Sequence, residues 1–305
     1  MDDVTDLVSA AGYGDDFMVG RLLGKHRADR RDFVNQLNSA GCSALEQVIL
    51  QGTSTPDLAA TARLLVAAGA DVEGPVGRTG MTPSELAGEA KMVDVMVLIN
   101  RLREATPPSD PNAALHAAAA TGDANEAVIA LRHGADIAHR AENHQQALLT
   151  AVYADHLEVA RLLLALGADP NADGGCKDTP WLVTGVTGSV PMALQILPYG
   201  PDLKKRNRYG GVSIIPASER GHVDYVRFAA DAGVNVNHVN DLHWTALLEA
   251  VILGDGSQPY VDIVRILLEH GANPDIADKD GVTALQHAKK KGQTEVVKML
   301  QGGKH

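Results

Sequence analysis

The feature that most constrains the fold is the stretch at residues 146–171, which reads QALLTAVYADHLEVARLLLALGADPN. Its apolar residues form two stripes with the spacing of amphipathic helices: Ala147, Leu148, Ala151 and Val152, then Val159, Leu162, Leu163 and Leu166. Gly167 ends the second helix, because glycine adopts the left-handed conformation without a Cβ penalty. Each helix is too short to be stable alone, so both apolar faces must be buried by neighbours.

The same pattern recurs along the chain at intervals of 33 residues. Its starts fall at five positions: Ala113, Gln146, Thr179, Val212 and Thr245. The glycine that ends the second helix keeps the same offset: Gly134, Gly167, Gly200 and Gly233. A chain of such repeats buries each apolar face against the next repeat, and therefore forms one elongated core.

This period resembles the ankyrin repeat. The resemblance is carried by residues 115–118 (LHAA) and Thr179-Pro180 at the start, and by residues 134–136, 167–169 and 271–273 (GAD or GAN) at the end. Looser copies begin near four further positions: Thr5, Ser43, Thr82 and Thr283. The resemblance implies an all-α ankyrin-repeat solenoid of about nine helix-turn-helix units, each joined to the next by a hairpin loop, here called the finger.

Residues 106–111 (TPPSDP) interrupt this series, because their prolines cannot continue a helix. The third repeat also lacks the closing glycine motif. We therefore expect three divergent repeats in residues 1–111 and six in residues 112–305, within one continuous solenoid whose weakest joint is at 101–112. The second and eighth repeats each carry about five extra residues between their helices, near 53–57 and 254–260.

Charge, the N-terminal segment and the cysteines indicate which partners, which cell compartment and which cofactors to expect. A formal net charge of −11 argues against nucleic-acid binding, which needs a basic surface. The acidic start MDDVTDLVSAAG is neither a signal peptide nor a membrane span, so we predict a cytoplasmic location. We also expect the protein to be a monomer. Cys42 and Cys176 lie four repeats apart, on the order of 40 Å, too far for a disulfide. No paired CxxC is present, and we expect no metal and no cofactor.

The resemblance also implies a concave binding face, formed by the fingers and the first helix of each repeat. At the corresponding offsets, the fourth repeat carries small or neutral residues, whereas later repeats carry aromatic and charged ones: Tyr153, Tyr209, Glu219, Arg220, Trp244 and Glu249. Tryptophan, tyrosine and arginine dominate the binding energy of protein interfaces. The sequence therefore predicts a non-enzymatic scaffold that binds a protein partner on the concave face of repeats five to eight, with Trp244 as the anchor.

A structural interpretation stays open for each of these residues. Glu219 and Arg220 are typical of a solvated helix face, and Trp244 could pack over the neighbouring finger. His116 occupies the family's usual histidine position, where the resemblance implies a structural role. His144 and His243 replace the finger glycine, which puts the tight turn in doubt at both places.

The competing hypothesis is a small-ligand or catalytic pocket formed by Pro216, Glu219, His238, Trp244 and Glu249. Glu219, His238 and Glu249 could support acid–base chemistry. Against catalysis, the sequence has no nucleophile motif, no glycine-rich phosphate loop, no HExxH and no paired CxxC. A zinc site at His238 and His243 is weaker still, because HxxxxH on a loop is a poor signal. A deep pocket enclosing both glutamates would favour this hypothesis, and a long open groove would favour the scaffold.

The segment at residues 210–256 looks like one found in bacterial ankyrin-repeat proteins of unassigned biochemistry. This resemblance implies a prokaryotic origin and no particular activity.

Overall fold

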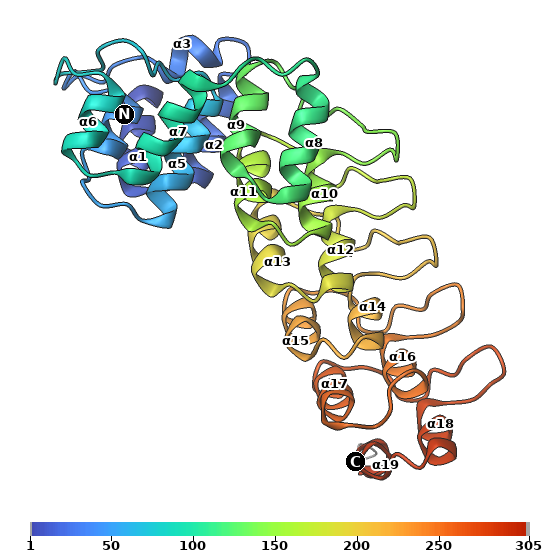
Figure 1. Ribbon diagram of the computed structural model, residues 1–305. Helices are drawn as coiled ribbons and strands as arrows, with labels where there is room; N and C mark the ends of the chain where they lie inside the picture. Colours follow the sequence, from blue (N-terminus) through green and yellow to red (C-terminus); the bar gives the residue numbers. More distant parts are fainter. Residues whose placement is uncertain (1, 303–305) are drawn as a thin grey trace. The chain divides into compact units, whose positions relative to one another are not determined.

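The computed structural model describes residues 2–302, and within that range the chain is all-α (Figure 1). The described residues contain no β-strand, although isolated β-bridges pair Val76 with Met81, Arg140 with Gln146 and Ala277 with Thr283. The chain forms two compact units. The N-terminal unit comprises the residues up to 142 together with 146–169, and the C-terminal unit comprises 143–145 together with the residues from 170 onward.

The C-terminal unit consists of two rows of helices. The first row is formed by α12 (Pro180–Thr187), α14 (Ile214–Glu219), α16 (Ala246–Ile252) and α18 (Ala284–Lys291). The second row is formed by α13 (Val190–Ile196) with the 3-10 turn η1 (Leu197–Tyr199), α15 (Val223–Asp231), α17 (Gln258–Glu269) and α19 (Thr294–Gly302). Successive helices within each row pack on one another, and the fingers project beyond the first row (Figure 1).

Local sequence signals explain where the helices of this unit begin and end. The hydroxyls of Thr179 and Thr245 accept hydrogen bonds from the amides of Leu182 and Leu248, at 3.3 and 3.2 Å, and so cap α12 and α16. The finger residue His243 adopts a left-handed conformation (φ 63°), as does His144 (φ 62°). The tight turn is therefore kept at both positions, although neither has a glycine.

The N-terminal unit contains five helix pairs and one additional helix. The pairs are α1 (Asp3–Tyr13) with α2 (Asp16–Lys25), α4 (Ala44–Ile49) with α5 (Pro56–Ala67), α6 (Pro83–Glu89) with α7 (Val93–Glu104), α8 (Pro111–Thr121) with α9 (Ala124–Arg132), and α10 (Ala147–Tyr153) with α11 (Leu157–Ala165). The additional helix, α3 (Arg30–Val34), forms within the long charged loop of the first repeat and buries Phe33 and Val34.

Within this unit, the first three pairs lie back to back with the fourth and fifth. Helix α5 packs on α9 and α11, α2 packs on α11, and α7 packs on α9 (Figure 1). Gly20 allows α2 to approach closely, since a Cβ there would lie 2.5 Å from the carbonyl oxygen of Ala165. This arrangement differs from the end-to-end stacking that the repeat period led us to expect between the third and fourth pairs.

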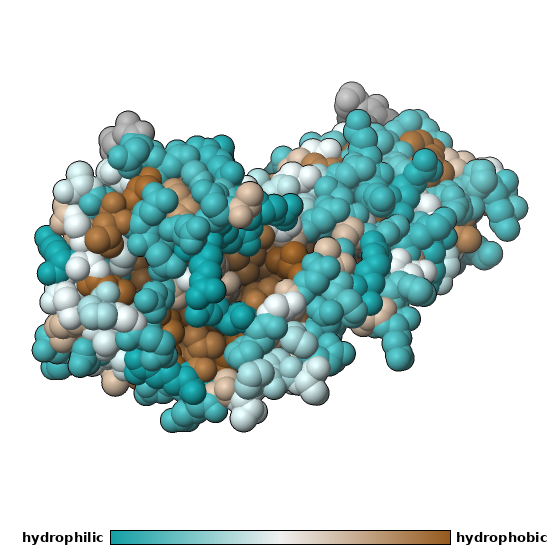
Figure 2. Space-filling view, turned by 90° about the horizontal axis from the view of Figure 1, so that it is seen from above, coloured by the Kyte–Doolittle hydropathy of each residue, from teal (hydrophilic) through white to brown (hydrophobic). Residues whose placement is uncertain are grey.

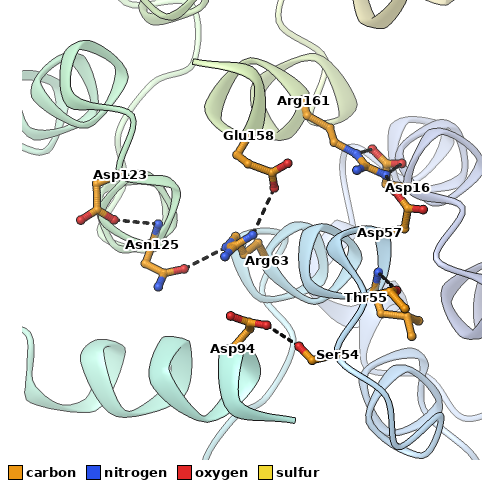
Figure 3. A network of polar contacts seen from close by, with 11 residues as sticks. Asp16, Ser54, Thr55, Asp57, Arg63, Asp94, Asp123, Asn125, Glu158 and Arg161 are labelled. Atoms are coloured by element: carbon orange, nitrogen blue, oxygen red, sulfur yellow. Dashed lines mark hydrogen bonds and ion pairs between the residues drawn. The ribbon is translucent and has the colours of Figure 1, made fainter. Parts of the chain in front are cut away.

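Ion pairs accompany this back-to-back packing (Figure 3). The Arg161 guanidinium on α11 donates to Asp16 at 2.9 and 2.7 Å and to Asp57 at 2.8 Å. Arg63 on α5 reaches Asn125 at 2.9 Å and Glu158 at 3.2 Å. Asp57 lies at the end of the insertion predicted at 53–57, so the insertion supplies part of the contact.

The stretch at residues 101–112 lies inside the N-terminal unit. Arg101 pairs with Asp123 at 2.9 Å and with Glu126 at 2.5 Å, which ties the end of α7 to the start of α9. Asp110 caps α8, and Pro111 is its first residue. A division of the repeats at residue 111 stays a prediction, and the compact units separate elsewhere, around residue 169.

The apolar stripes predicted in residues 146–171 are confirmed as core, because Val152, Val159 and Leu163 are completely buried. Leu7 and Leu23 of the first repeat are completely buried as well. Both cysteines are free, with Cys42 buried and Cys176 exposed. None of the helices in residues 2–302 is both long enough and apolar enough to span a bilayer.

Candidate binding pocket

A pocket of about 320 Å³ opens in the C-terminal unit between two consecutive repeats. Its walls come from helices α14 and α16 and from the fingers that precede them. The lining residues are Asn207, Arg208, Tyr209, Gly211, Ile215, Pro216, Glu219, Arg220, Asn240, Leu242, Trp244, Glu249 and Leu253. The pocket therefore combines an apolar wall, two aromatic rings and four charged groups.

The structure brings together five of the six residues predicted for partner binding. Tyr209, Glu219, Arg220, Trp244 and Glu249 all line this pocket, and so does Pro216. The sixth, Tyr153, ends α10 in the N-terminal unit and is exposed.

His238 does not join the two glutamates. It lines a separate pocket of about 590 Å³ with Pro201, Arg206 and Asn235. Its Nε2 lies 2.6 Å from the carbonyl oxygen of Gly210, so the ring holds the neighbouring finger. The predicted acid–base set of Glu219, His238 and Glu249 is therefore not gathered at one pocket.

The fingers that frame the pocket are built on asparagines that the sequence analysis did not single out. The side-chain oxygen of Asn240 accepts hydrogen bonds from the amides of Leu242 and Trp244, at 3.0 and 2.9 Å. Asn207 does the same for Tyr209 and Gly211, both at 2.9 Å. A signal was present, because asparagine or aspartate stands five residues before several repeat starts: Asn38, Asn207, Asn240 and Asp278.

Glu249, on α16, is the most buried charged group of the pocket, with 5% of its surface exposed. Its Oε1 accepts a hydrogen bond from the side-chain amide of Asn240 at 3.0 Å. Burial, and then the negative charge of Glu219, raise the pKa of Glu249 to about 7, against the opposing effects of Asn240 and Arg220. Near neutral pH, this carboxyl is therefore present in both its neutral and its charged form.

The remaining charges lie nearer the rim. Arg220 donates to Glu219 at 2.9 Å and to the carbonyl oxygen of Pro216 at 3.2 Å. The Arg208 guanidinium stands 4.8 Å from the centre of the Tyr209 ring. The hydroxyl of Tyr260 donates to the backbone oxygen of Glu219 at 3.1 Å and fixes the end of α14.

Another pocket, about 480 Å³ in volume, lies in the N-terminal unit. Its polar side chains Arg132 and Asn35 already form hydrogen bonds within the protein. Arg132 donates to the carbonyl oxygens of Val66 and Ala70, at 3.2 and 3.0 Å, and Asn35 bonds the backbone at Gly69 and Asp71. The face seen in Figure 2 is mostly hydrophilic, with hydrophobic patches among the polar side chains.

Within residues 2–302, no three His, Cys, Asp or Glu side chains are grouped so that they could hold a metal ion.

His116 lies outside the pocket between α14 and α16. Its ring contacts that of His139, with 3.4 Å between ring nitrogens, and burial lowers the pKa of His116.

The fold and its repeated units define an ankyrin-repeat protein. A family model for ankyrin repeats in three copies matches residues 86–173, 186–278 and 217–304, so the chain belongs to the ankyrin-repeat family. Ankyrin repeats are generally protein–protein interaction modules.

Three ankyrin-repeat proteins are similar to this chain over most of their own length. The putative ankyrin repeat protein YahD of Escherichia coli is 35% identical over 184 residues, which are 60% of this chain and 92% of YahD. A solved ankyrin repeat domain from Acinetobacter baumannii is 48% identical, with a TM-score of 0.60, over 62% of this chain and 96% of that domain. The solved ankyrin repeat protein EF0377 is 37% identical, also with a TM-score of 0.60, over 62% of this chain and 97% of its own.

Proposed function

We propose that this protein is a non-enzymatic interaction scaffold that binds a protein partner on the finger side of the C-terminal unit. Trp244 is its anchor, and Tyr209, Glu219, Arg220 and Glu249 orient the partner. The observation that carries the proposal is the single pocket that gathers all five of these residues. Tyr153, which is exposed in the N-terminal unit, stays a separately proposed partner contact.

The exposure of these side chains supports a binding role. Tyr209 is 54% exposed, Leu242 and Leu253 are about half exposed, and Trp244 is partly buried at the pocket wall. An aromatic and aliphatic cluster rimmed by charges is typical of an interface hot spot, where a central anchor is shielded by polar neighbours.

The test starts from the partner captured from the native cell extract and measures its affinity for purified variants. Trp244→Ala is expected to weaken binding by at least about 2 kcal/mol, roughly thirtyfold, without lowering the melting temperature. Tyr209→Ala is also expected to weaken partner binding. Tyr13→Ala is the matched control, because Tyr13 is an 85% exposed tyrosine of the N-terminal unit. Unchanged affinity with a large loss of stability would give Trp244 a packing role and remove the anchor.

A second candidate is a small-molecule pocket. The observation in its favour is that Glu219 and Glu249 line the same pocket, whose volume lies at the lower end of ligand sites. A screen of small metabolites by thermal shift separates the two candidates. A shift that Trp244→Ala abolishes, with no protein partner captured, would favour the small ligand.

A further inference from the structure

We propose that the pocket between α14 and α16 receives a basic side chain of the partner, an arginine guanidinium or a lysine ammonium, and that Glu249 accepts its hydrogen bond. This inference rests on the proposed function and names the chemical group that the Trp244 site recognises.

The first argument is the unused hydrogen-bonding capacity of a buried carboxylate. Among the described residues, Asn240 is the one group that donates to the Glu249 side chain. A carboxylate can accept several hydrogen bonds, and a buried one is stabilised by a charged donor. Glu249 lines the pocket, so a donor that enters from solvent can supply what the protein does not.

The second argument is the distribution of the other charges. Arg220 is already paired with Glu219, and Arg208 stands over the Tyr209 ring, so both guanidiniums have partners within the protein. Because both guanidiniums are engaged in this way, Glu249 is the buried charged acceptor that remains in the pocket. A negatively charged ligand would be repelled by it.

The third argument is the shape of a basic side chain. Arginine and lysine carry a charged end on an apolar stem. Ile215, Pro216, Leu242 and Trp244 provide an apolar and aromatic wall for the stem, and an aromatic face also attracts a cation. A pocket of about 320 Å³ is of the size that takes one such side chain and not a whole folded element.

The experiment uses the full chain and single-residue probes, N-acetyl-arginine amide and N-acetyl-lysine amide. N-acetyl-citrulline amide is the neutral counterpart of the arginine probe, and N-acetyl-glutamate amide is the acidic one. Binding is followed by the NMR signal of the Trp244 indole N–H. The other tryptophan, Trp181, is completely buried and serves as an internal reference. A basic probe is expected to bind with a dissociation constant on the order of 1 mM, which corresponds to a weak single contact.

Two variants test the role of the carboxylate. Glu249→Gln keeps the size of the side chain and its contact with Asn240 but removes the charge. It is expected to lower the affinity for the basic probes about tenfold. Glu219→Gln, on the more exposed rim, is expected to lower the affinity for these probes by a smaller factor. Glu295→Gln is the control, because Glu295 is exposed on α19 and pairs with Lys298. Circular dichroism confirms that each variant is folded.

A pH titration adds an independent readout, because the pKa of Glu249 is raised to about 7 whereas arginine stays charged. Affinity for the arginine probe is expected to rise between pH 6 and pH 8 and to lose this dependence in Glu249→Gln. The charged and titratable groups around Glu249 are Glu219 and Arg220 at the end of α14, Arg208 and Tyr209 from the finger, Tyr260 from α17, and Lys291 of α18, which donates to the backbone oxygen of Ile252 at the end of α16. His243, next to Trp244, is controlled by His243→Asn, since asparagine tolerates the left-handed turn.

Tighter binding of arginine or lysine than of citrulline, lost in Glu249→Gln, supports the proposal, and the ratio of the two basic probes shows which side chain is preferred. Equal binding of arginine and citrulline, preference for glutamate, or no shift of the Trp244 signal at any concentration overturns it. These results leave the scaffold proposal standing if the captured partner still depends on Trp244, so the two proposals fail separately.

Discussion

Glu46 in the N-terminal unit and Glu249 in the C-terminal unit lie on the first helix of their repeats, α4 and α16, and both are almost fully buried, with 0% and 5% of their surface exposed. Glu46 accepts hydrogen bonds from the backbone amides of Arg78 and Thr79, at 3.3 and 3.0 Å, in the finger of the following repeat. Glu249 accepts one from the side chain of Asn240, in the finger of its own repeat.

The difference follows from one position on the helix. Glu46 is the third residue after the repeat start Ser43, and Glu249 is the fourth after Thr245. One residue turns a side chain by about 100° around an α-helix. Glu46 therefore reaches the next finger, where its carboxylate comes so close to Gly77 that a Cβ could not fit. Glu249 reaches the pocket on the side of Glu219. A buried carboxylate with two backbone donors is a structural element, and one with spare acceptors beside a pocket is a candidate binding group.

The largest effect is expected for Glu46→Ala. The substitution leaves two partly buried backbone amides without their partner and empties the buried position of the Glu46 side chain, so it should lower the free energy of unfolding by about 3–5 kcal/mol. Urea unfolding measures it, with Glu89→Ala on the exposed face of α6 as the control. A loss below about 1 kcal/mol would show that Glu46 has no structural role, and the comparison with Glu249 would fail.

The repeat register on which this comparison depends is tested by Leu163→Ala. Leu163 is completely buried on α11, so its truncation should cost about 2–5 kcal/mol. The same change at Lys290, exposed at the end of α18, should cost almost nothing. Equal losses at the two positions would contradict the register.

Much of this architecture follows from the sequence, because it depends on local spacing. The period identified the repeats and their helix-ending glycines, and the same offsets placed Tyr209, Trp244 and Glu249 on one face. The back-to-back packing could not be predicted, since it depends on partners such as Arg161 and Asp16, which are 145 residues apart and share no local pattern.

The pocket itself was only partly predictable. The position of a residue within its repeat predicts whether it faces the fingers, but it does not predict the direction of the side chain. His238 was therefore wrongly grouped with Glu219 and Glu249. Asn240 was missed because an asparagine in a loop is typical of any turn. Its second role, as donor to Glu249, appears only once the finger is folded over α16.

Glu249→Gln should have an effect of the opposite sign. Burial raises the pKa of Glu249 from 4.5 to about 7, so the folded state favours the protonated form. Below about pH 4.5, both states are protonated and the carboxyl carries no penalty. Between pH 4.5 and 7, only the unfolded state ionises readily, and the folded protein loses stability as pH rises. At pH 8, Glu249→Gln should therefore be more stable than the wild type by about 3 kcal/mol, and at pH 4 the two should be equal.

Chemical unfolding at the two pH values measures this difference, with Glu295→Gln as the control. A variant that is less stable than the wild type at pH 8 would mean that the ionised carboxylate is satisfied in the free protein. Glu249 would then resemble Glu46.

The smallest effect is expected for Arg220→Ala. Its ion pair with Glu219 is well exposed, with 40% of each side chain accessible, and pairs of this kind contribute little, so the free energy of unfolding should change by less than about 0.5 kcal/mol. The informative quantity is the pKa of Glu249, which Arg220 lowers. Its removal should raise that pKa further, most clearly at low salt, because screening weakens the interaction of exposed charges. Carbon-detected NMR titration of the Glu249 carboxyl follows the change. Arg265→Ala, which breaks an exposed pair with Asp262 on α17, should leave the pKa of Glu249 where it was. If Arg220→Ala also left it unchanged, the charge of Arg220 would not reach the pocket, and a basic group entering from the partner would meet even less repulsion than the wild-type structure indicates.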